Sequence, residues 1–190
     1  RNGVIQNVAY ELLGKATDLA KELGHQVVAV LLGYGIKDQA QSLVEMGADE
    51  VIVIDRPELK DYLTEQYKQA MYQLIMARKP QIVLYGATTI GRDLAPRLAC
   101  KLHSGLVADC TKLTIELDKE GKKEFYSTRP AFGGNLMATI VCPTSRPQMS
   151  TVRPGVMQKL QRDVNRKGII SEFEPVFDEK EFKVRLISTE

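Results

Sequence analysis

Two hydrophobic periods alternate along the first hundred residues of the chain. Apolar side chains recur three and four positions apart, the spacing of an amphipathic helix, in residues 8–23, 38–46, 61–78 and 91–103. Between them lie short continuous apolar runs, typical of parallel strands covered on both faces, in residues 27–33, 51–54 and 81–86. This alternation predicts βαβ units and therefore a doubly wound, mostly parallel α/β sheet.

The first element of this pattern is a helix, whereas a sheet of this class normally begins with a strand. The chain also starts with Arg1-Asn2-Gly3 rather than with methionine. We therefore expect the first strand of the sheet to lie upstream of Arg1. We also expect the 190 residues to be the ordered or expressed part of a longer chain.

A different pattern follows Gly105, because the helical spacing stops there. Residues 111–117 and 124–128 alternate loosely on either side of a charged turn around Gly121, which predicts an antiparallel hairpin. Two further short strands are expected at residues 136–142 and 148–152. The sequence therefore predicts an antiparallel addition to the parallel sheet.

The last part of the chain is polar and charged until residues 182–187, which alternate as an edge strand would. We expect one α/β domain over residues 1–157 and an extended C-terminal arm over residues 158–190. A segment of this composition has little apolar surface to bury on its own, so we expect the arm to fold against a partner.

The composition, with 44% hydrophobic and 26% charged residues, is that of a soluble globular protein. The net charge of +2 gives no general attraction to nucleic acid or to an anionic membrane. The longest apolar run is far shorter than the ~20 residues that span a bilayer, so we expect no membrane span. Three well-separated cysteines predict reduced core thiols and a cytoplasmic protein: Cys100, Cys110 and Cys142. The two histidines have no ligand spacing, and we expect no metal site.

A candidate anion site follows the third apolar strand. Gly86, two threonines and Gly91 lead into a helix whose first turn carries Arg92. Backbone N–H groups and the dipole at such a helix start favour phosphate, but the pattern is neither the P-loop nor the dinucleotide fingerprint. The equally weighted alternative is structural, in which Gly86 ends the strand, Thr88 or Thr89 caps the helix and the arginine faces a protein partner.

Two arginines, Arg129 and Arg153, each precede a proline at the end of an expected strand. Proline holds its predecessor in an extended conformation, so each arginine is held at a fixed point. Gly133 and Gly134 allow the backbone to approach a planar ligand closely. Fixed arginines beside a glycine pair suit a delocalised anion or a protein interface, and ordinary surface salt bridges are the alternative.

No catalytic arrangement of side chains is evident. The serines lack a nucleophile-elbow context, a triad needs more than two scattered histidines, and the carboxylates are spread over helix faces. We therefore expect an electron carrier or binding subunit rather than a stand-alone enzyme.

Three segments together resemble the alpha subunit of electron-transfer flavoproteins: residues 86–99, 105–111 and 128–135. The order of elements from residue 8 to about residue 156 is similar too. The resemblance implies a nucleotide-alpha-hydrolase-like fold, a beta subunit of similar fold as partner, and a C-terminal FAD-binding domain, absent from these 190 residues, to which the arm leads. Residues 147–154 are similar to electron-bifurcating members, which carry a second FAD, held mainly by the beta subunit, in place of AMP.

The resemblance also implies the roles of particular residues. Arg153 would lie beside the isoalloxazine ring of the shared FAD, with Arg129 nearby, and Pro154, Gly133 and Gly134 would complete the cofactor-binding set. A fixed positive charge near the ring favours its anionic forms. The implied function is to hold and tune FAD while electrons pass between NADH, or an acyl-CoA or other flavin dehydrogenase, and ferredoxin, flavodoxin or a quinone-linked acceptor, by flavin-based bifurcation.

A second hypothesis belongs to another functional class. The chain could be a stand-alone AMP- or ATP-binding α/β domain of the stress-protein type. Such a domain places its phosphate site on a glycine-rich loop of its own, whereas residues 86–91 contain only two glycines. Binding of AMP or ATP by the chain alone separates this hypothesis from a shared flavin site.

Overall fold

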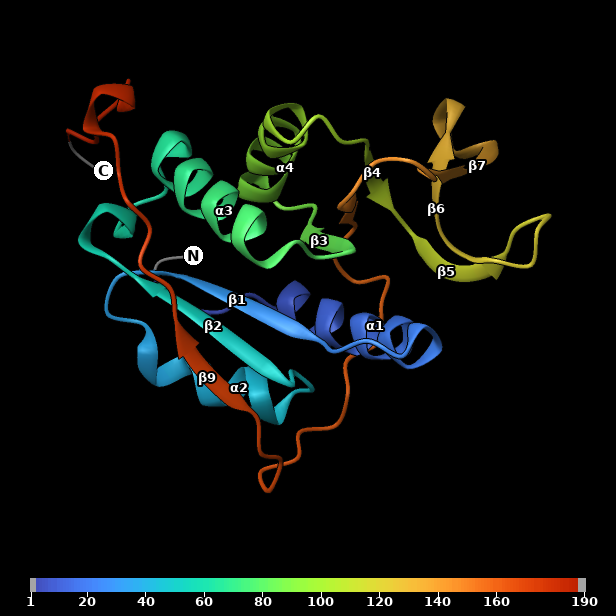
Figure 1. Ribbon diagram of the computed structural model, residues 1–190, viewed down its shortest axis with the longest axis horizontal. Helices are drawn as coiled ribbons and strands as arrows, with labels where there is room; N and C mark the ends of the chain where they lie inside the picture. The colour runs from blue at the N-terminus through green and yellow to red at the C-terminus, as the bar shows by residue number, and fades with distance from the viewer. Residues whose placement is uncertain (1–2, 188–190) are drawn as a thin grey trace.

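The computed structural model describes residues 3–187 of the chain. Two parallel sheets and one antiparallel sheet make up the molecule (Figure 1). The first parallel sheet has the order β1-β2-β9, with β1 at Val28–Gly33, β2 at Glu50–Asp55 and β9 at Ile169–Glu172. Helix α1 at Asn7–Leu23 leads into β1, and α2 at Ala40–Glu45 connects β1 to β2.

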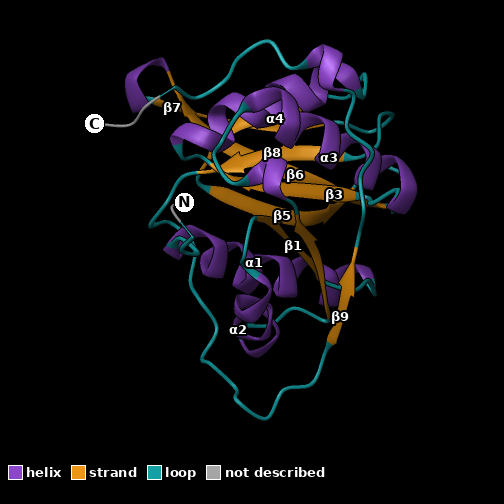
Figure 2. Ribbon diagram, turned by 90° about the vertical axis from the view of Figure 1, so that its left-hand side faces the viewer, coloured by secondary structure: helices purple, strands orange, loops and turns teal. Residues whose placement is uncertain are grey.

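The second parallel sheet has the order β3-β8-β4, with β3 at Ile82–Gly86, β8 at Gln148–Val152 and β4 at Leu106–Cys110. The helices α3 at Thr64–Arg78 and α4 at Thr89–Lys101 pack beside each other next to this sheet (Figure 2). The central strand β8 is buried along its whole length. The expected α/β class with mostly parallel sheets is confirmed.

The third sheet is the antiparallel addition, with the order β5-β6-β7: β5 at Lys112–Leu117, β6 at Lys123–Ala131 and β7 at Leu136–Val141. The predicted hairpin is confirmed, with Leu113 opposite Ser127 in its register. A hydrogen bond of 2.7 Å between the hydroxyls of Ser127 and Ser150 ties this sheet to β8. Short 3-10 turns complete the chain at Lys37–Gln39, Pro57–Leu59, Phe132–Gly134 and Glu179–Glu181.

Local sequence explains where the helices begin and end. Helix α1 ends at Gly24, which takes a left-handed conformation (φ 71°) that glycine adopts without a steric penalty. Helix α3 ends at Lys79, directly before Pro80, which cannot continue a helix. Helix α4 begins after Thr88, whose hydroxyl accepts a hydrogen bond from the backbone N–H of Gly91.

The expectation of an edge strand at residues 182–187 is wrong, because these residues form no strand and Val184 and Leu186 are exposed. The arm instead pairs at Ile169–Glu172, where the free edge of β2 accepts a parallel strand. The arm therefore pairs where β2 offers unpaired backbone N–H and C=O groups. An alternating pattern with no such strand edge beside it did not form a strand.

Strand β4 was not predicted from the sequence. It is short, it contains Asp109, and its pairing with β8 shifts register between Val107 and Cys110. The arm also folds in part against its own chain, which was not expected, because Arg162 and Arg166 form ion pairs with Glu45 and Asp49. These acidic side chains and the free edge of β2 order this part of the arm, and its contact with a partner stays a prediction.

The three cysteines are free thiols. They were expected in the core, and for one of them this is wrong. Cys110 is buried and Cys142 is half-buried, but Cys100 is exposed at the end of α4. Within residues 3–187 no helix is both long and apolar enough to cross a bilayer.

Candidate functional site

The loops after three parallel strands meet at one edge of the second sheet. The N–H of Ala87, after β3, donates to the carbonyl of Val152 at 2.7 Å, and the N–H of Arg153, after β8, donates to the carbonyl of Cys110 at 3.0 Å. The carboxyl ends of β3, β8 and β4 are therefore joined by backbone hydrogen bonds. In open parallel sheets this edge is where ligands bind.

Asp109 organises the side chains at this edge. Its carboxylate accepts hydrogen bonds from Arg153, at 2.6 Å for Nη2 and 3.3 Å for Nε, and from Nη2 of Arg92 at 3.2 Å. Asp109 itself has a left-handed backbone (φ 62°), and its N–H donates to the hydroxyl of Thr151 at 2.8 Å. We call Asp109, Arg92, Arg129 and Arg153 the Asp109 cluster.

The loop before α4 fixes Arg92. Nε of Arg92 donates to the carbonyl of Ala87 at 2.9 Å. At Gly91 a Cβ atom would stand 1.9 Å from the carbonyl oxygen of Gly86, so only glycine fits there. Gly86 ends β3 and Thr88 caps α4, as the structural alternative expected. Anion binding by this loop stays a prediction.

Arg153 lies where the sequence placed it, directly after β8, and the expectation that Arg129 also ends a strand is wrong. Arg129 lies inside β6, opposite Ala138 of β7. Beyond Thr128 only β7 flanks β6, so Pro130 is tolerated because its missing N–H faces no β5 partner. Within the described residues Arg129 forms no hydrogen bond or ion pair, although its charge acts on Asp109.

The electrostatics of the cluster are strongly positive. The hydrogen bond from Arg153 lowers the pKa of the Asp109 carboxyl, burial opposes this, and the charges of Arg153, Arg92 and Arg129 lower it further. The same hydrogen bond raises the pKa of the Arg153 guanidinium. Three arginines around one ionised carboxylate leave two positive charges uncompensated within the cluster.

The chemistry of these donors fits a delocalised anion. A guanidinium offers planar, forked N–H donors and stacks on ring systems, and a fixed positive charge beside a flavin ring stabilises its anionic forms. The donors of the cluster are therefore compatible with a planar, delocalised anion such as a flavin ring, and contact of Arg153 and Arg129 with that ring stays a prediction. The Arg153 side chain is about half exposed, so a ligand can reach the guanidinium group while Asp109 keeps it oriented.

Across residues 3–187 the remaining predicted site residues form no hydrogen bond with the cluster. Pro154 is exposed and follows Arg153, and the next N–H, that of Gly155, donates to a carboxylate oxygen of Glu11 at 2.8 Å. Gly133 and Gly134 form the turn between β6 and β7 with left-handed backbones (φ 70° and 92°), and open space surrounds both. Their contact with a cofactor stays a prediction.

Sequence reasoning missed Asp109 and the role of Arg92 beside it. The only signal was a single acidic residue inside an apolar pentapeptide, at the end of a strand that was not recognised. Across the described part of the chain, no group of three or more histidine, cysteine or acidic side chains is arranged to hold a metal ion.

Characterised proteins are similar to this chain over most of its length. An electron transfer flavoprotein subunit alpha of Thermoanaerobacterium thermosaccharolyticum is 50% identical over 188 residues, which cover 99% of this chain and 56% of that protein. An acryloyl-CoA reductase electron transfer subunit beta of Anaerotignum propionicum is 46% identical over 85% of this chain and 49% of its own length. The LctC subunit of a lactate dehydrogenase (NAD(+),ferredoxin) of Acetobacterium woodii is 44% identical over 84% of this chain and 37% of its own length.

The chain thus spans about half the length of the relatives it matches. The family model of the electron transfer flavoprotein domain matches residues 1–177, nearly the whole sequence. That match includes every strand that carries the Asp109 cluster. The chain therefore belongs to the electron transfer flavoprotein domain family, and its relatives include alpha subunits of these flavoproteins.

Proposed function

We propose that this chain is the alpha-subunit part of a heterodimeric electron-transfer flavoprotein and that it helps to hold and tune a shared FAD. The observation that carries the proposal is the Asp109 cluster. Two uncompensated positive charges lie on fixed backbone at the carboxyl edge of a parallel sheet, in a member of this family. FAD, when bound, supplies the redox chemistry. The chain supplies fixed positive charge and helps to position the cofactor.

Arg153 is the residue that tunes the flavin. Its backbone is fixed by the hydrogen bond to Cys110, and its side chain is oriented by Asp109. A guanidinium oriented before the ligand binds loses less conformational entropy on binding than a free one. Its positive charge favours the anionic forms of the ring and raises the flavin potential.

The expected partner is a beta subunit of similar fold. Strand β7 exposes apolar side chains on both of its faces, and the turn before it adds another, and no other described residue buries them: Phe132, Leu136, Met137, Ile140 and Val141. A concentration of exposed apolar side chains on one strand and its turn is typical of a protein interface. A shared flavin site requires such a permanent contact.

The names of two relatives support a proposal for the electron donors and acceptors. One relative is part of a lactate dehydrogenase that uses NAD(+) and ferredoxin, and another is an electron transfer subunit of acryloyl-CoA reductase. We propose that this cytoplasmic protein passes electrons between NADH or a flavin dehydrogenase and ferredoxin or flavodoxin, by flavin-based bifurcation. A second FAD would lie in the C-terminal domain of the whole subunit.

The flavin content of the co-purified heterodimer tests this proposal. We expect flavin to be retained by the complex of the whole alpha subunit with its beta subunit. We also expect little or no binding of FAD, AMP or ATP to the 190-residue chain alone, since its arginines form one wall of the site. Stoichiometric AMP or ATP binding by the chain alone would support the stand-alone nucleotide sensor and contradict the shared flavin site.

A further inference from the structure

A buried carboxylate outside the Asp109 cluster contacts the chain just after Arg153. Glu11 of α1 is only 7% exposed, and its Oε2 accepts the hydrogen bond of 2.8 Å from the N–H of Gly155. A buried carboxylate needs a hydrogen-bond partner, and among the described residues this backbone N–H is the one that it has. Given the proposed function, on which this inference rests, we propose that Glu11 is a positioning residue. It holds the turn after Arg153 and so fixes where the guanidinium lies.

The turn after Arg153 depends on a partner outside itself. It runs through Pro154 and Gly155, and Gly155 has a left-handed backbone (φ 82°). Proline followed by a glycine of positive φ is the sequence of a type II turn, which a hydrogen bond from its fourth N–H to its first carbonyl often closes. In the part of the chain that the structure describes, no backbone hydrogen bond closes this turn. The bond from Gly155 to Glu11 holds it instead and ties it to α1.

The same face of α1 also holds the chain beyond the turn. Asn7, Glu11 and Gly14 are spaced four and three positions apart, so they share one face of the helix. Oδ1 of Asn7 accepts a hydrogen bond of 2.9 Å from Nζ of Lys159. At Gly14 a Cβ atom would stand 2.2 Å from the carbonyl oxygen of Gln158, so only glycine lets the backbone pass this close. Three positions on one helix face therefore hold the turn and the segment after it.

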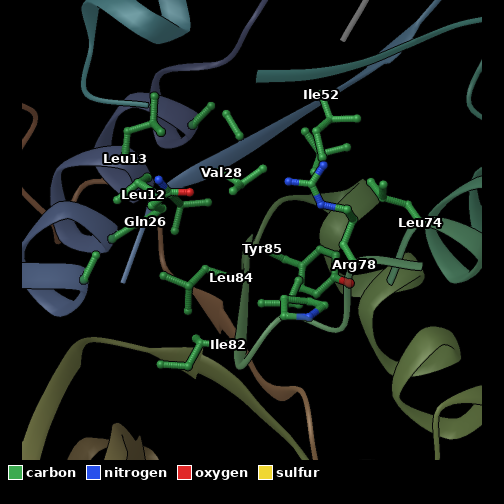
Figure 3. Close-up of a pocket in the computed structure, with 18 of the residues that line it drawn as sticks. Leu12, Leu13, Gln26, Val28, Ile52, Leu74, Arg78, Ile82, Leu84 and Tyr85 are labelled. Atoms are coloured by element: carbon green, nitrogen blue, oxygen red, sulfur yellow. The ribbon is translucent and has the colours of Figure 1, made fainter. Parts of the chain in front are cut away.

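Apolar packing fixes α1 against both ends of the turn. Leu12 and Leu19 of α1 share a hydrophobic cluster with Val152, the last residue of β8. Met157, which follows the turn, packs against the same cluster. Figure 3 shows Leu12 on the wall of an apolar cavity that Leu84 of β3 also lines, so the helix packs on the second sheet as well. The helix is therefore a fixed platform for the turn.

Arg153 is thus held from two sides of the chain. Its own N–H donates to the carbonyl of Cys110 in β4, and the N–H two residues later donates to Glu11 in α1. Asp109 then orients a guanidinium whose backbone is fixed at both ends. A group that acts on a bound ligand is effective only where its supporting residues hold it, because a looseness of about 1 Å is enough to weaken a site. Under the proposed function, Glu11 therefore acts on the flavin ring through Arg153 without touching the ring.

Two substitutions separate the position of Glu11 from its charge. Glu11→Gln keeps the length of the side chain and an oxygen acceptor but removes the carboxylate. Glu11→Asp keeps the carboxylate but is one methylene shorter, so it loses the hydrogen bond from Gly155. Glu22→Asp, an exposed change on the same helix, controls for the lower helix propensity of aspartate.

Redox titration and hydrogen exchange test the inference in the heterodimer of the whole alpha subunit with its beta subunit. We expect Glu11→Asp to make the flavin potential more negative, by less than Arg153→Ala does. The same variant should speed the exchange of the Gly155 amide about tenfold or more, since that amide loses its acceptor. Glu11→Gln and Glu22→Asp should keep both the potential and the exchange rate of the wild type.

Three results would overturn the inference. A potential that shifts in Glu11→Gln but not in Glu11→Asp assigns Glu11 an effect of charge in place of position. A potential that shifts in Arg153→Ala but not in Glu11→Asp makes Glu11 a structural residue and leaves the proposed function intact. A potential unchanged in both of these variants contradicts the proposed function as well. If Glu11→Asp does not fold, Glu11→Gln decides: a wild-type potential with a slowly exchanging Gly155 amide supports the inference, and a shifted potential contradicts it.

Discussion

Asp109 combines a left-handed backbone with a carboxylate that accepts hydrogen bonds from two arginines. An aspartate at positive φ is uncommon, and here the N–H bond to Thr151 holds it. Exposed ion pairs contribute only ~0–1 kcal/mol to stability, so the cluster does little for folding. The cluster orients Arg153, so under the proposed function a change at Asp109 alters the flavin potential more than it alters folding.

Asp109→Asn should separate orientation from folding. Asparagine keeps the size and tolerates the left-handed backbone, so we expect the melting temperature to change little. Loss of the negative charge leaves three arginines uncompensated, and the flavin potential of the heterodimer should become more positive. Redox titration measures this, with Asp18→Asn, an exposed change on α1, as the control that should shift nothing. An unchanged potential in Asp109→Asn would show that the carboxylate does not act on the flavin.

The pH dependence of stability gives a second test at Asp109. Its pKa in the folded chain is lowered from 3.8, chiefly by the hydrogen bond from Arg153, so its contribution is present above that ordinary value and disappears as pH falls through the lower, folded value. We expect the wild type to lose its small advantage over Asp109→Asn as the pH falls below the ordinary carboxyl value of 3.8. Urea denaturation of both proteins at a series of acidic pH values measures the difference. An advantage that persists or grows on acidification contradicts the ion pair.

At the residue scale the sequence predicted Arg153 and the loop before α4 as parts of a site. It did not predict that Asp109 brings them together. Arg153 could be found because a proline follows it at the end of an apolar run. Asp109 could not, because its role depends on the irregular register of β4 against β8, which has no sequence period. Arg129 was placed at a strand end because a proline was assumed to stop the strand.

The connection between β3 and α4 is the element on which the site depends most. Gly91→Ala puts a methyl group against the carbonyl of Gly86, which the first turn of α4 cannot avoid without moving. We expect a loss of ~1–3 kcal/mol in the free energy of unfolding, as for other overpacked sites. Thr89→Ala, an exposed change in the same turn, should stay within about ±0.5 kcal/mol. Equal stabilities of the two variants in urea titrations would contradict a close contact between a side chain at position 91 and the carbonyl of Gly86.

Elements with a clear hydrophobic period were predicted well. Elements whose formation depends on pairing with a neighbouring strand were not. Helix α1 and strands β1, β2 and β3 follow directly from their apolar spacing. Residues 182–187 alternate but form no strand, whereas Ile169–Glu172 have a weaker pattern and pair with β2. Strand formation at an edge depends on an available partner, and a sequence period does not report it.

At the scale of the whole molecule, the proposed interface with the beta subunit lies on the exposed apolar side chains of β7. Met137→Lys places a charge on an apolar surface without touching the core, so we expect the isolated chain to keep its stability. Its affinity for the beta subunit should fall at least about tenfold, or ~1.4 kcal/mol. Met76→Lys, an equally exposed methionine on α3, is the matched control and should bind normally. Unchanged binding of Met137→Lys in sedimentation or calorimetry would move the interface away from β7.

Removal of Arg153 tests the central claim most directly. Arg153 is exposed and its partner Asp109 keeps Arg92, so Arg153→Ala should change the free energy of unfolding by no more than about ±0.5 kcal/mol. Loss of a fixed positive charge should lower the flavin potential, by ~59 mV per one-electron step for each ~1.4 kcal/mol of lost stabilisation. Arg129→Ala should give a weaker shift in the same direction.

The measurement is a redox titration of the heterodimer assembled from the whole alpha subunit and its beta subunit, with wild type, Arg153→Ala and Arg129→Ala compared under the same conditions. The account predicts more negative flavin potentials in Arg153→Ala with an unchanged melting temperature. One-electron potentials that stay at their wild-type values would make Arg153 an ordinary surface arginine and contradict the flavin-tuning role of this chain.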